Sequence, residues 1–237
     1  MGYGIQLYSV NKCMIENAAD TIKKVAEMGY KSIEPCSFSG MTAKEYKALC
    51  ESLGLTISGA HLGWQKLTDE TIDETIAFLK EVGCPKFIIP NHNTANEADM
   101  AELVALINKY APVFKANGLE LMYHNHSPEF TFNQDKKFPH LILQKETDIR
   151  FEIDVYWTWR AGLNPLYILE QLSDRVGAIH LKDGNRTAGT PVGQGEVPIK
   201  EVVEWAVKHN VDMVVENEPD GVHELEQAKE CIDFLLK

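Results

Sequence analysis

Residues 151–157 read Phe-Glu-Ile-Asp-Val-Tyr-Trp, an apolar stretch of strand length with a carboxylate, Asp154, near its far end. Short runs rich in β-branched and aromatic residues are typical of buried strands. Three further runs share the design, an apolar segment that ends in a residue able to bind a metal or move a proton: 121–126, 178–183 and 213–218. If these strands are parallel neighbours, their C-terminal ends lie together and their polar groups converge on one point.

The composition predicts a chain with a large core and no anionic partner. It has 237 residues, of which 44% are hydrophobic, and a formal net charge of -12. Nucleic acids and anionic membranes attract clustered Lys and Arg, so this charge argues against both as partners. The five cysteines are scattered without a close pair, which suits a reducing cytosol, and no run is long enough to span a bilayer. We therefore expect a cytoplasmic protein without a signal segment.

A repeated order of amphipathic helix, glycine and short strand runs through the first half of the chain. Gly can adopt the left-handed conformation that closes a helix and turns the chain into a strand. We expect helices to end in this way at four positions: Gly29, Gly54, Gly83 and Gly118. The second of these helices begins with a capping box, Thr42 with Glu45 three residues later.

Counted along the whole chain, the pattern gives eight strands in alternation with eight helices. The strands begin with 4–8 and include 55–61 and 149–155. Strict alternation favours a parallel sheet, so we predict an α/β fold, a (β/α)8 TIM barrel forming a single domain over residues 1–237. A doubly wound open sheet is the alternative. It is disfavoured because no glycine-rich phosphate loop follows the first strand.

The C-terminal ends of barrel strands carry the catalytic groups of TIM barrels. The expected strand ends are almost all able to ligate a metal, bind a sugar hydroxyl or transfer a proton. In chain order they are Tyr8, Glu34, His61, Asn91, His124 with His126, Asp154, His180, and Glu216 with Glu218. One such residue alone would mean little, but the set predicts an active site.

Four successive strands offer a mixed nitrogen and oxygen ligand set made of His124, Asp154, His180 and Glu216. Such a set suits one divalent ion, and Mn, Fe, Co, Zn and Mg all remain open. A packing role for Asp154 is disfavoured because an unpaired buried carboxylate is costly. For His61 and His126, packing and function are expected about equally.

Further groups near the strand ends are candidates for contact with the substrate. Trp157 can form a wall for a sugar ring, with packing at the barrel rim as the alternative. Lys182 can hold a substrate oxygen or a developing enolate, or pair with a neighbouring carboxylate. Glu129 can reach the site from its loop. Asp183 is interpreted as a loop or supporting group, and the glycines in 193–196 are a weak phosphate signal.

With these residues in place, the chain resembles the sugar phosphate isomerase/epimerase family of xylose isomerase-like TIM barrels. The motifs that carry the resemblance are Tyr-His-Asn-His at 123–126, Glu-Ile-Asp-Val-Tyr-Trp at 152–157, Arg-Ala-Gly at 160–162, His-Leu-Lys-Asp at 180–183, Gly-Gln-Gly-Glu at 193–196 and Val-Glu at 215–216. The resemblance implies one divalent metal held by a Glu, an Asp, a His and a second Glu, with the two Glu moving the proton. Asp154, His180 and Glu216 match the last three ligands, but His124 stands where better-known members have the first Glu.

The resemblance implies an isomerase or epimerase that removes the proton next to a sugar carbonyl, with a metal-stabilised enediolate. The catalytic candidates are Glu216, His124 and Lys182. The candidates for substrate binding are Glu34, His61, His126, Glu129 and Trp157. The expected partner is a small sugar or sugar derivative, and an assembly of identical copies is left open.

Other functions remain open. A neutral His124 in place of Glu leaves the metal more electropositive and removes one candidate base. A lyase or dehydratase acting on a keto-sugar or 3-keto-glycoside therefore fits equally well. An endonuclease of the endonuclease-IV type is disfavoured by the acidic balance and by an expected lack of extra His and carboxylates for a multi-metal cluster. A non-catalytic sugar-binding barrel is the last alternative.

Overall fold

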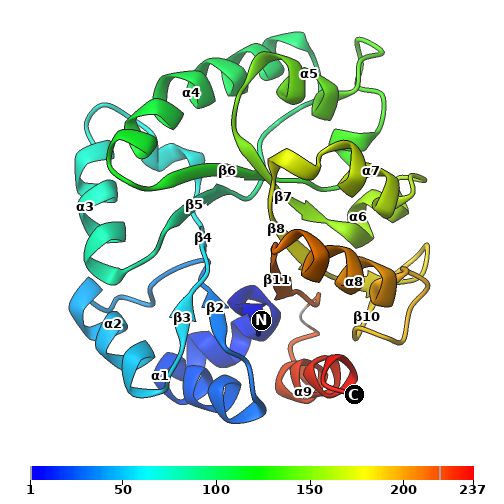
Figure 1. Cartoon of the computed structure of the whole chain (residues 1–237). Helices are drawn as coiled ribbons and strands as arrows, with labels where there is room; N and C mark the ends of the chain where they lie inside the picture. Colours follow the sequence, from blue (N-terminus) through cyan, green and yellow to red (C-terminus); the bar gives the residue numbers. More distant parts are fainter. Residues whose placement is uncertain (1, 219) are drawn as a thin grey trace.

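The structure, a computed structural model, describes residues 2–218 and 220–237. Helices surround a central set of parallel strands, and both termini lie on the same side of the ring in the view of Figure 1. The sheet order is β3-β2-β1-β11-β8-β7-β6-β5-β4. The strands are β1 (Tyr3–Gln6), β2 (Ser32–Glu34), β3 (Thr56–Ile57), β4 (Ala60–His61), β5 (Lys86–Ile89), β6 (Glu120–His124), β7 (Arg150–Asp154), β8 (Val176–Leu181) and β11 (Asp212–Val215). A separate antiparallel pair joins β9 (Asp183–Gly184) to β10 (Gly189–Thr190).

β3 and β4, at the two ends of this sheet order, are the two halves of one interrupted barrel strand. β3 pairs with β2 and β4 pairs with β5, and only residues 58–59 separate β3 from β4. A Cβ atom at Gly59 would lie 2.7 Å from Ile88 Cδ1 and 3.2 Å from Glu34 Oε2, so glycine permits this close approach. The predicted eight-staved TIM barrel is confirmed, but the continuous strand expected at 55–61 is broken in two.

The helices cover the outside of the barrel (Figure 1). They are α1 (Asn11–Met28), α2 (Ala43–Ser52), α3 (Ile72–Val82), α4 (Glu97–Ala116), α5 (Pro139–Glu146), α6 (Val155–Arg160), α7 (Pro165–Gln171), α8 (Ile199–His209) and α9 (Glu224–Leu235). Gly29 and Gly83 close α1 and α3 in the left-handed conformation, and Thr42 forms the predicted capping box with Glu45. Within the described ranges, no helix combines the length and apolar character needed to cross a membrane.

Several strands end earlier than the sequence predicted. β1 ends at Gln6 and a 3-10 turn, η1 (Leu7–Val10), follows, which leaves Tyr8 42% exposed. β7 ends at Asp154, whose Oδ1 accepts the backbone N–H of Trp157 at 2.8 Å and caps α6. The aromatic residues after Asp154 therefore begin a helix, because this carboxylate satisfies a free N–H of its first turn.

Side-chain alternation sorts the barrel interior into layers. Lys86 pairs with Asp212 near the N-terminal ends of the strands. Ile88, Met122 and Ala178 form a separate small apolar cluster. Residues two apart on a strand share a face, so ionisable side chains toward the C-terminal ends point inward together. This layer is buried and contains the candidate site.

Candidate metal centre

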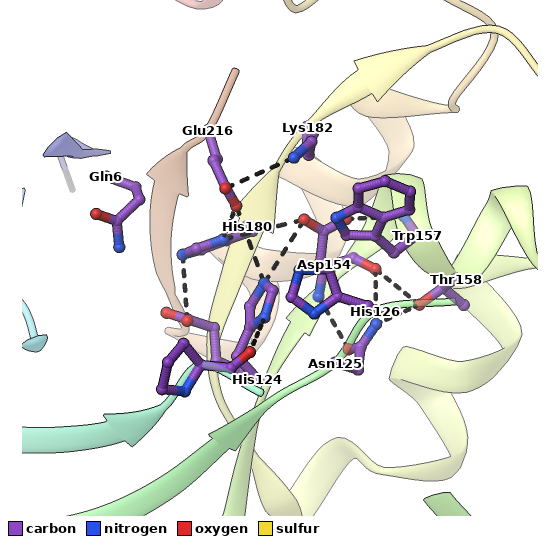
Figure 2. A network of polar contacts seen from close by, with 12 residues as sticks. Gln6, His124, Asn125, His126, Asp154, Trp157, Thr158, His180, Lys182 and Glu216 are labelled. Atoms are coloured by element: carbon purple, nitrogen blue, oxygen red, sulfur yellow. Dashed lines mark hydrogen bonds and ion pairs between the residues drawn. The ribbon is translucent and has the colours of Figure 1, made fainter. Parts of the chain in front are cut away.

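Four strands bring the four predicted ligands together. His124 ends β6, Asp154 ends β7, His180 lies in β8 and Glu216 follows β11 directly. The strands are neighbours in the sheet, with Asp154 and Val214 on either side of His180 in register. One ligand atom from each of the four side chains lies within 4.8 Å of all the others. Figure 2 shows the side chains pointing toward one another.

The atoms that face one another are two carboxylate oxygens and two imidazole nitrogens. Nδ1 of His180 lies 2.6 Å from Oε2 of Glu216. Nε2 of His124 lies 3.7 Å from Oδ2 of Asp154 and 3.9 Å from Oε2 of Glu216. The other ring nitrogen of His124, Nδ1, lies 3.2 Å from the carbonyl oxygen of Pro90. This contact assigns the proton to Nδ1 and leaves a lone pair on Nε2.

Two of these atoms lack a donor. In the part of the chain that the structure describes, neither His124 Nε2 nor Asp154 Oδ2 has a hydrogen-bond partner, although both residues are buried. Unsatisfied buried acceptors are costly, and a divalent cation at their common centre would satisfy them. Two imidazoles and two carboxylates also form an ordinary ligand set for such an ion. The residues present therefore fit a divalent metal.

Burial controls the protonation of this group. Desolvation raises the pKa of Asp154 to about 6. Desolvation and the neighbouring imidazoles lower the pKa of His124 to about 3, which keeps that ring neutral. For His180 burial lowers the pKa, but Glu152 and Glu216 outweigh burial and raise it well above the ordinary value. In the absence of a metal, a proton on His180 therefore neutralises part of the acidic cluster.

Lys182 supplies a permanent positive charge beside the centre. Its side chain is 1% exposed, and its Nζ lies 3.5 Å from Glu216 Oε1 and also pairs with Glu218. Burial lowers its pKa, but the carboxylates of Glu216, Asp154 and Glu218 outweigh burial and raise it. Lys182 therefore stays protonated and can donate a hydrogen bond, but it cannot act as a base.

Glu34 and His61, the predicted substrate-binding residues of the early strands, lie in a second buried group. Nε2 of His61 lies 2.6 Å from Glu152 Oε2 and 3.2 Å from Glu34 Oε1. Nε2 of His180 approaches the same two carboxylates, so the four residues form a second set of possible metal ligands. The expectation that the chain lacks extra His and carboxylates was therefore wrong. These residues are spread over distant strands that only the closed barrel unites.

His126 and Glu129 lie at the rim. Glu129 is 2% exposed, and its carboxylate accepts the hydroxyl of Tyr123 at 2.8 Å and the backbone N–H of His126 at 2.9 Å. Both of its oxygens are engaged in bracing the loop. The imidazole of His126 lies between the rings of His124 and Trp157, and burial lowers its pKa to about 4.

A cleft lies next to the residues that follow Asp154 and Glu216 in the chain. Its volume is about 580 Å³, and its lining includes Trp157, Arg160, Asn217 and Glu218. A second hollow of about 360 Å³ is lined in part by His126 and Trp157. Trp157 therefore borders both spaces.

Glu152 and Gln6 are the residues of this region that sequence reasoning did not single out. Glu152 has the same strand parity as Asp154, so alternation along β7 already placed it on the inner face. Gln6 was not singled out because Tyr8, two residues later, was expected to be the functional residue at the end of the first strand. Its Nε2 donates to Glu34 Oε1 at 2.8 Å.

Comparison with known proteins places this barrel in a family. The sequence profile of the xylose isomerase-like TIM barrel family matches residues 22–237. The chain belongs to this family. The match begins within α1 and includes all four residues of the proposed metal centre. No match to the sequence was found among curated proteins.

Several solved structures share the xylose isomerase-like barrel. A sugar phosphate isomerase/epimerase from Parabacteroides distasonis has a TM-score of 0.86 and 23% identity, over 100% of this chain and 98% of that chain. The probable 3-DHS dehydratase AsbF from Bacillus anthracis has a TM-score of 0.78 and 15% identity, over 100% and 99%. An L-ribulose 3-epimerase has a TM-score of 0.75 and 14% identity, over 99% and 93%. At these identities the likeness establishes the fold.

Proposed function

We propose that this barrel is a metal-dependent sugar isomerase or epimerase that removes a proton next to a sugar carbonyl. One observation carries the proposal: four buried ligand atoms from four neighbouring strands lie within 4.8 Å of one another at the C-terminal mouth. His124, Asp154, His180 and Glu216 would hold one divalent ion. Such an ion supplies Lewis acidity, which makes the C–H bond beside a carbonyl easier to ionise. Solved structures with the same barrel include a sugar phosphate isomerase/epimerase and an L-ribulose 3-epimerase, which agrees with this class.

Glu216 is the proposed base. Burial raises its pKa, but the positive charges of Lys182 and His180 outweigh burial and hold the pKa well below the ordinary value. Glu216 is therefore ionised at neutral pH and can accept a proton. Its Oε2 faces His180, whereas Oε1 faces Lys182 at 3.5 Å. Oε1 is thus the oxygen proposed to receive the proton, and the ammonium of Lys182 would stabilise negative charge on the substrate oxygen.

A lyase or dehydratase on a keto-sugar is the second candidate, and the chemistry of His124 favours it. An isomerase must return the proton at a second position, which a second carboxylate would do. His124 stands in that place as an imidazole whose Nδ1 faces the carbonyl oxygen of Pro90 and whose Nε2 would bind the metal, so neither nitrogen is free to accept a proton. One deprotonation by Glu216 followed by loss of a β-substituent needs no second base. The probable 3-DHS dehydratase AsbF has the same fold, which supports this second candidate.

The experiment is a metal assay followed by turnover in heavy water. We expect the purified protein to carry about one divalent ion per chain and to exchange deuterium into a ketose or keto-glycoside. Glu216→Gln should lower that exchange by about 10²- to 10⁴-fold, the usual contribution of a general base. Asp154→Ala should lose the metal as well.

The products separate the two candidates. A deuterated product of unchanged formula identifies an isomerase or epimerase, whereas an unsaturated or shortened product identifies a lyase. Asp148→Asn, a change at an exposed carboxylate, is the control and should keep both the metal and the exchange. Full exchange by Asp154→Ala would contradict the proposal.

A further inference from the structure

His180 presents its two ring nitrogens to different groups. Nδ1 faces the proposed metal centre, 2.6 Å from Glu216 Oε2. Nε2, across the ring, lies 2.9 Å from Glu34 Oε1 and 3.1 Å from Glu152 Oε2. Figure 2 shows contacts leaving the His180 ring on both sides. The imidazole is fully buried, so all of its polar contacts come from the protein.

The two carboxylates behind Nε2 are held firmly in place. Glu34 and Glu152 are both 0% exposed. His61 connects them through Nε2, and its ring stacks on that of His180 at a centroid distance of 5.1 Å. Gln6 adds an N–H bond to Glu34 Oε1, while its own Oε1 accepts the backbone N–H of Tyr8. Glu34 and Glu152 are therefore turned toward the ring of His180.

This arrangement decides where His180 carries its proton. An ionised carboxylate can only accept, so a contact with Nε2 requires a hydrogen on that nitrogen. By the same reasoning, the 2.6 Å contact of Nδ1 with Glu216 holds a second proton in the metal-free protein. A metal at the centre would displace that second proton, and the neutral ring, with its one N–H on Nε2, would present the lone pair of Nδ1 to the metal.

We propose that Glu152 and Glu34 are positioning residues that hold the Nε2–H of His180. They keep the lone pair of Nδ1 directed at the metal, and His61 keeps the two carboxylates in place. The inference rests on the proposed function, because it requires His180 to be a ligand. A carboxylate behind a ligating imidazole fixes the ring and makes it more basic, and its loss typically weakens metal affinity by about 10- to 100-fold.

A second metal ion is the competing use of the same residues. Ligand atoms of Glu34, His61, Glu152 and His180 also lie within 4.8 Å of one another. An ion there would remove the proton from Nε2 and make His180 a bridge between two ions. The contacts favour the proton, because Nε2 of His180 lies within hydrogen-bond distance of both Glu34 Oε1 and Glu152 Oε2, and Gln6 also donates to Glu34 Oε1.

Glu152→Gln tests the proposal, since it removes the charge and keeps the shape. The variant should bind Co²⁺ or Zn²⁺ about 10- to 100-fold more weakly in a chelator competition, and the visible absorption spectrum of bound Co²⁺ should change. Glu34→Gln should act in the same direction. Glu224→Gln is the matched control, because Glu224 is also a buried carboxylate but accepts the backbone N–H groups of Lys12 and Cys13 instead. It should bind metal as the wild type does.

A measurement on the unaltered protein covers the case in which a variant fails to fold. In the Zn²⁺-loaded protein with ¹⁵N-labelled histidine, the proposal expects His180 to be protonated at Nε2 and bound to the metal at Nδ1. Unchanged affinity and Co²⁺ spectrum in Glu152→Gln, an unprotonated Nε2, or two ions per chain would each overturn it. A wild type that binds no metal would instead overturn the proposed function.

Discussion

At the residue scale, Asp154 and His180 are expected to make metal binding depend on pH. The pKa of His180 is raised well above its usual value by Glu152 and Glu216, so a metal must displace a proton from His180 at neutral pH. The pKa of Asp154 is raised to about 6 by burial, so below that pH a second proton must leave. Metal affinity should therefore fall as the pH falls, by about one power of ten per pH unit near neutrality and by about two below pH 6.

Chelator competition between pH 5 and pH 8 measures these slopes. In Asp154→Asn the residual affinity should lose the steeper part below pH 6. An affinity independent of pH would show that neither residue gives up a proton to the metal.

The same carboxylate should destabilise the metal-free protein. The pKa of Asp154 is about 6 in the folded state, above the ordinary value of about 4, so the folded state binds this proton more tightly. Its stabilising contribution is therefore present below pH 4 and is lost as the pH rises through 6, a change of about 3 kcal/mol. Without metal, Asp154→Asn should be more stable than the wild type at pH 7.5 by up to this amount, and the advantage should vanish near pH 4.

Urea unfolding in the presence of a chelator measures this difference. Asn keeps an oxygen for the backbone N–H of Trp157, so the cap on α6 can survive the change. Asp148→Asn, at an exposed position, should leave the stability within about 0.5 kcal/mol at either pH. A variant less stable than the wild type at pH 7.5 would contradict the expected cost of burying this charge.

How far single residues could be predicted depended on strand parity. Asp154 and His180 were predictable because each interrupts an apolar strand near its C-terminal end. Glu152 lies on the same strand face as Asp154, but the sequence around it does not indicate which residues it contacts. Those partners, His61 and His180, come from β4 and β8, and only the closed barrel brings them together. The long-range pairing that defines the second group cannot be read from local sequence.

At the element scale, Asp183 organises the loop after β8. Its Oδ1 accepts the backbone N–H groups of Gly184 and Val197, and its Oδ2 accepts those of Gly193 and Gly195. A Cβ at Gly195 would lie 2.2 Å from Asp183 Oδ1, so the loop needs glycine there. The glycines interpreted as a weak phosphate signal thus turn N–H groups toward a carboxylate of the chain itself. These contacts agree with the expectation that Asp183 is a supporting group, although it lies in β9.

Asp183→Asn should loosen residues 184–197. An amide can accept with only one oxygen, so two backbone N–H groups would face its NH₂ group, and we expect a cost of about 1–3 kcal/mol. Hydrogen exchange at Gly193, Gly195 and Val197 should accelerate, while exchange in β5 and β6 stays unchanged. Asp174→Asn, at an exposed position before β8, is the control. Unchanged protection in Asp183→Asn would show that other contacts hold the loop.

The order of the elements was predictable because it follows local patterns, while their interruptions were not. Helix ends were predictable at Gly29, Gly83 and the Thr42 capping box, because each depends on contacts between residues close together in the sequence. The break at Gly59 depends on Ile88 and Glu34 from neighbouring staves. β7 ends at Asp154 because this side chain caps α6. The apolar residues that follow are compatible with a strand or a helix, so their apolar character alone does not predict where the strand ends.

At the scale of the whole molecule, the barrel interior concentrates more negative than positive fixed charge. Glu34, Glu152, Asp154 and Glu216 are all buried at its C-terminal end, and Lys182 is the buried lysine beside them. Charges in a low-dielectric interior must be balanced by ions or protons. A divalent ion would therefore stabilise the folded barrel as well as serve its chemistry, and binding would be coupled to folding.

This coupling gives a prediction for residues 1–237 as a unit, which were expected to form a single domain. At a free metal concentration of 100 times Kd the folded state gains about 2.7 kcal/mol. For a chain of this size that gain raises Tm by about 5–10 °C. Calorimetry should show one transition that moves upward with added metal in the wild type and stays in place in Asp154→Ala, whose centre lacks a ligand. Two separate transitions would contradict the single domain, and an equal shift in both proteins would place the metal elsewhere.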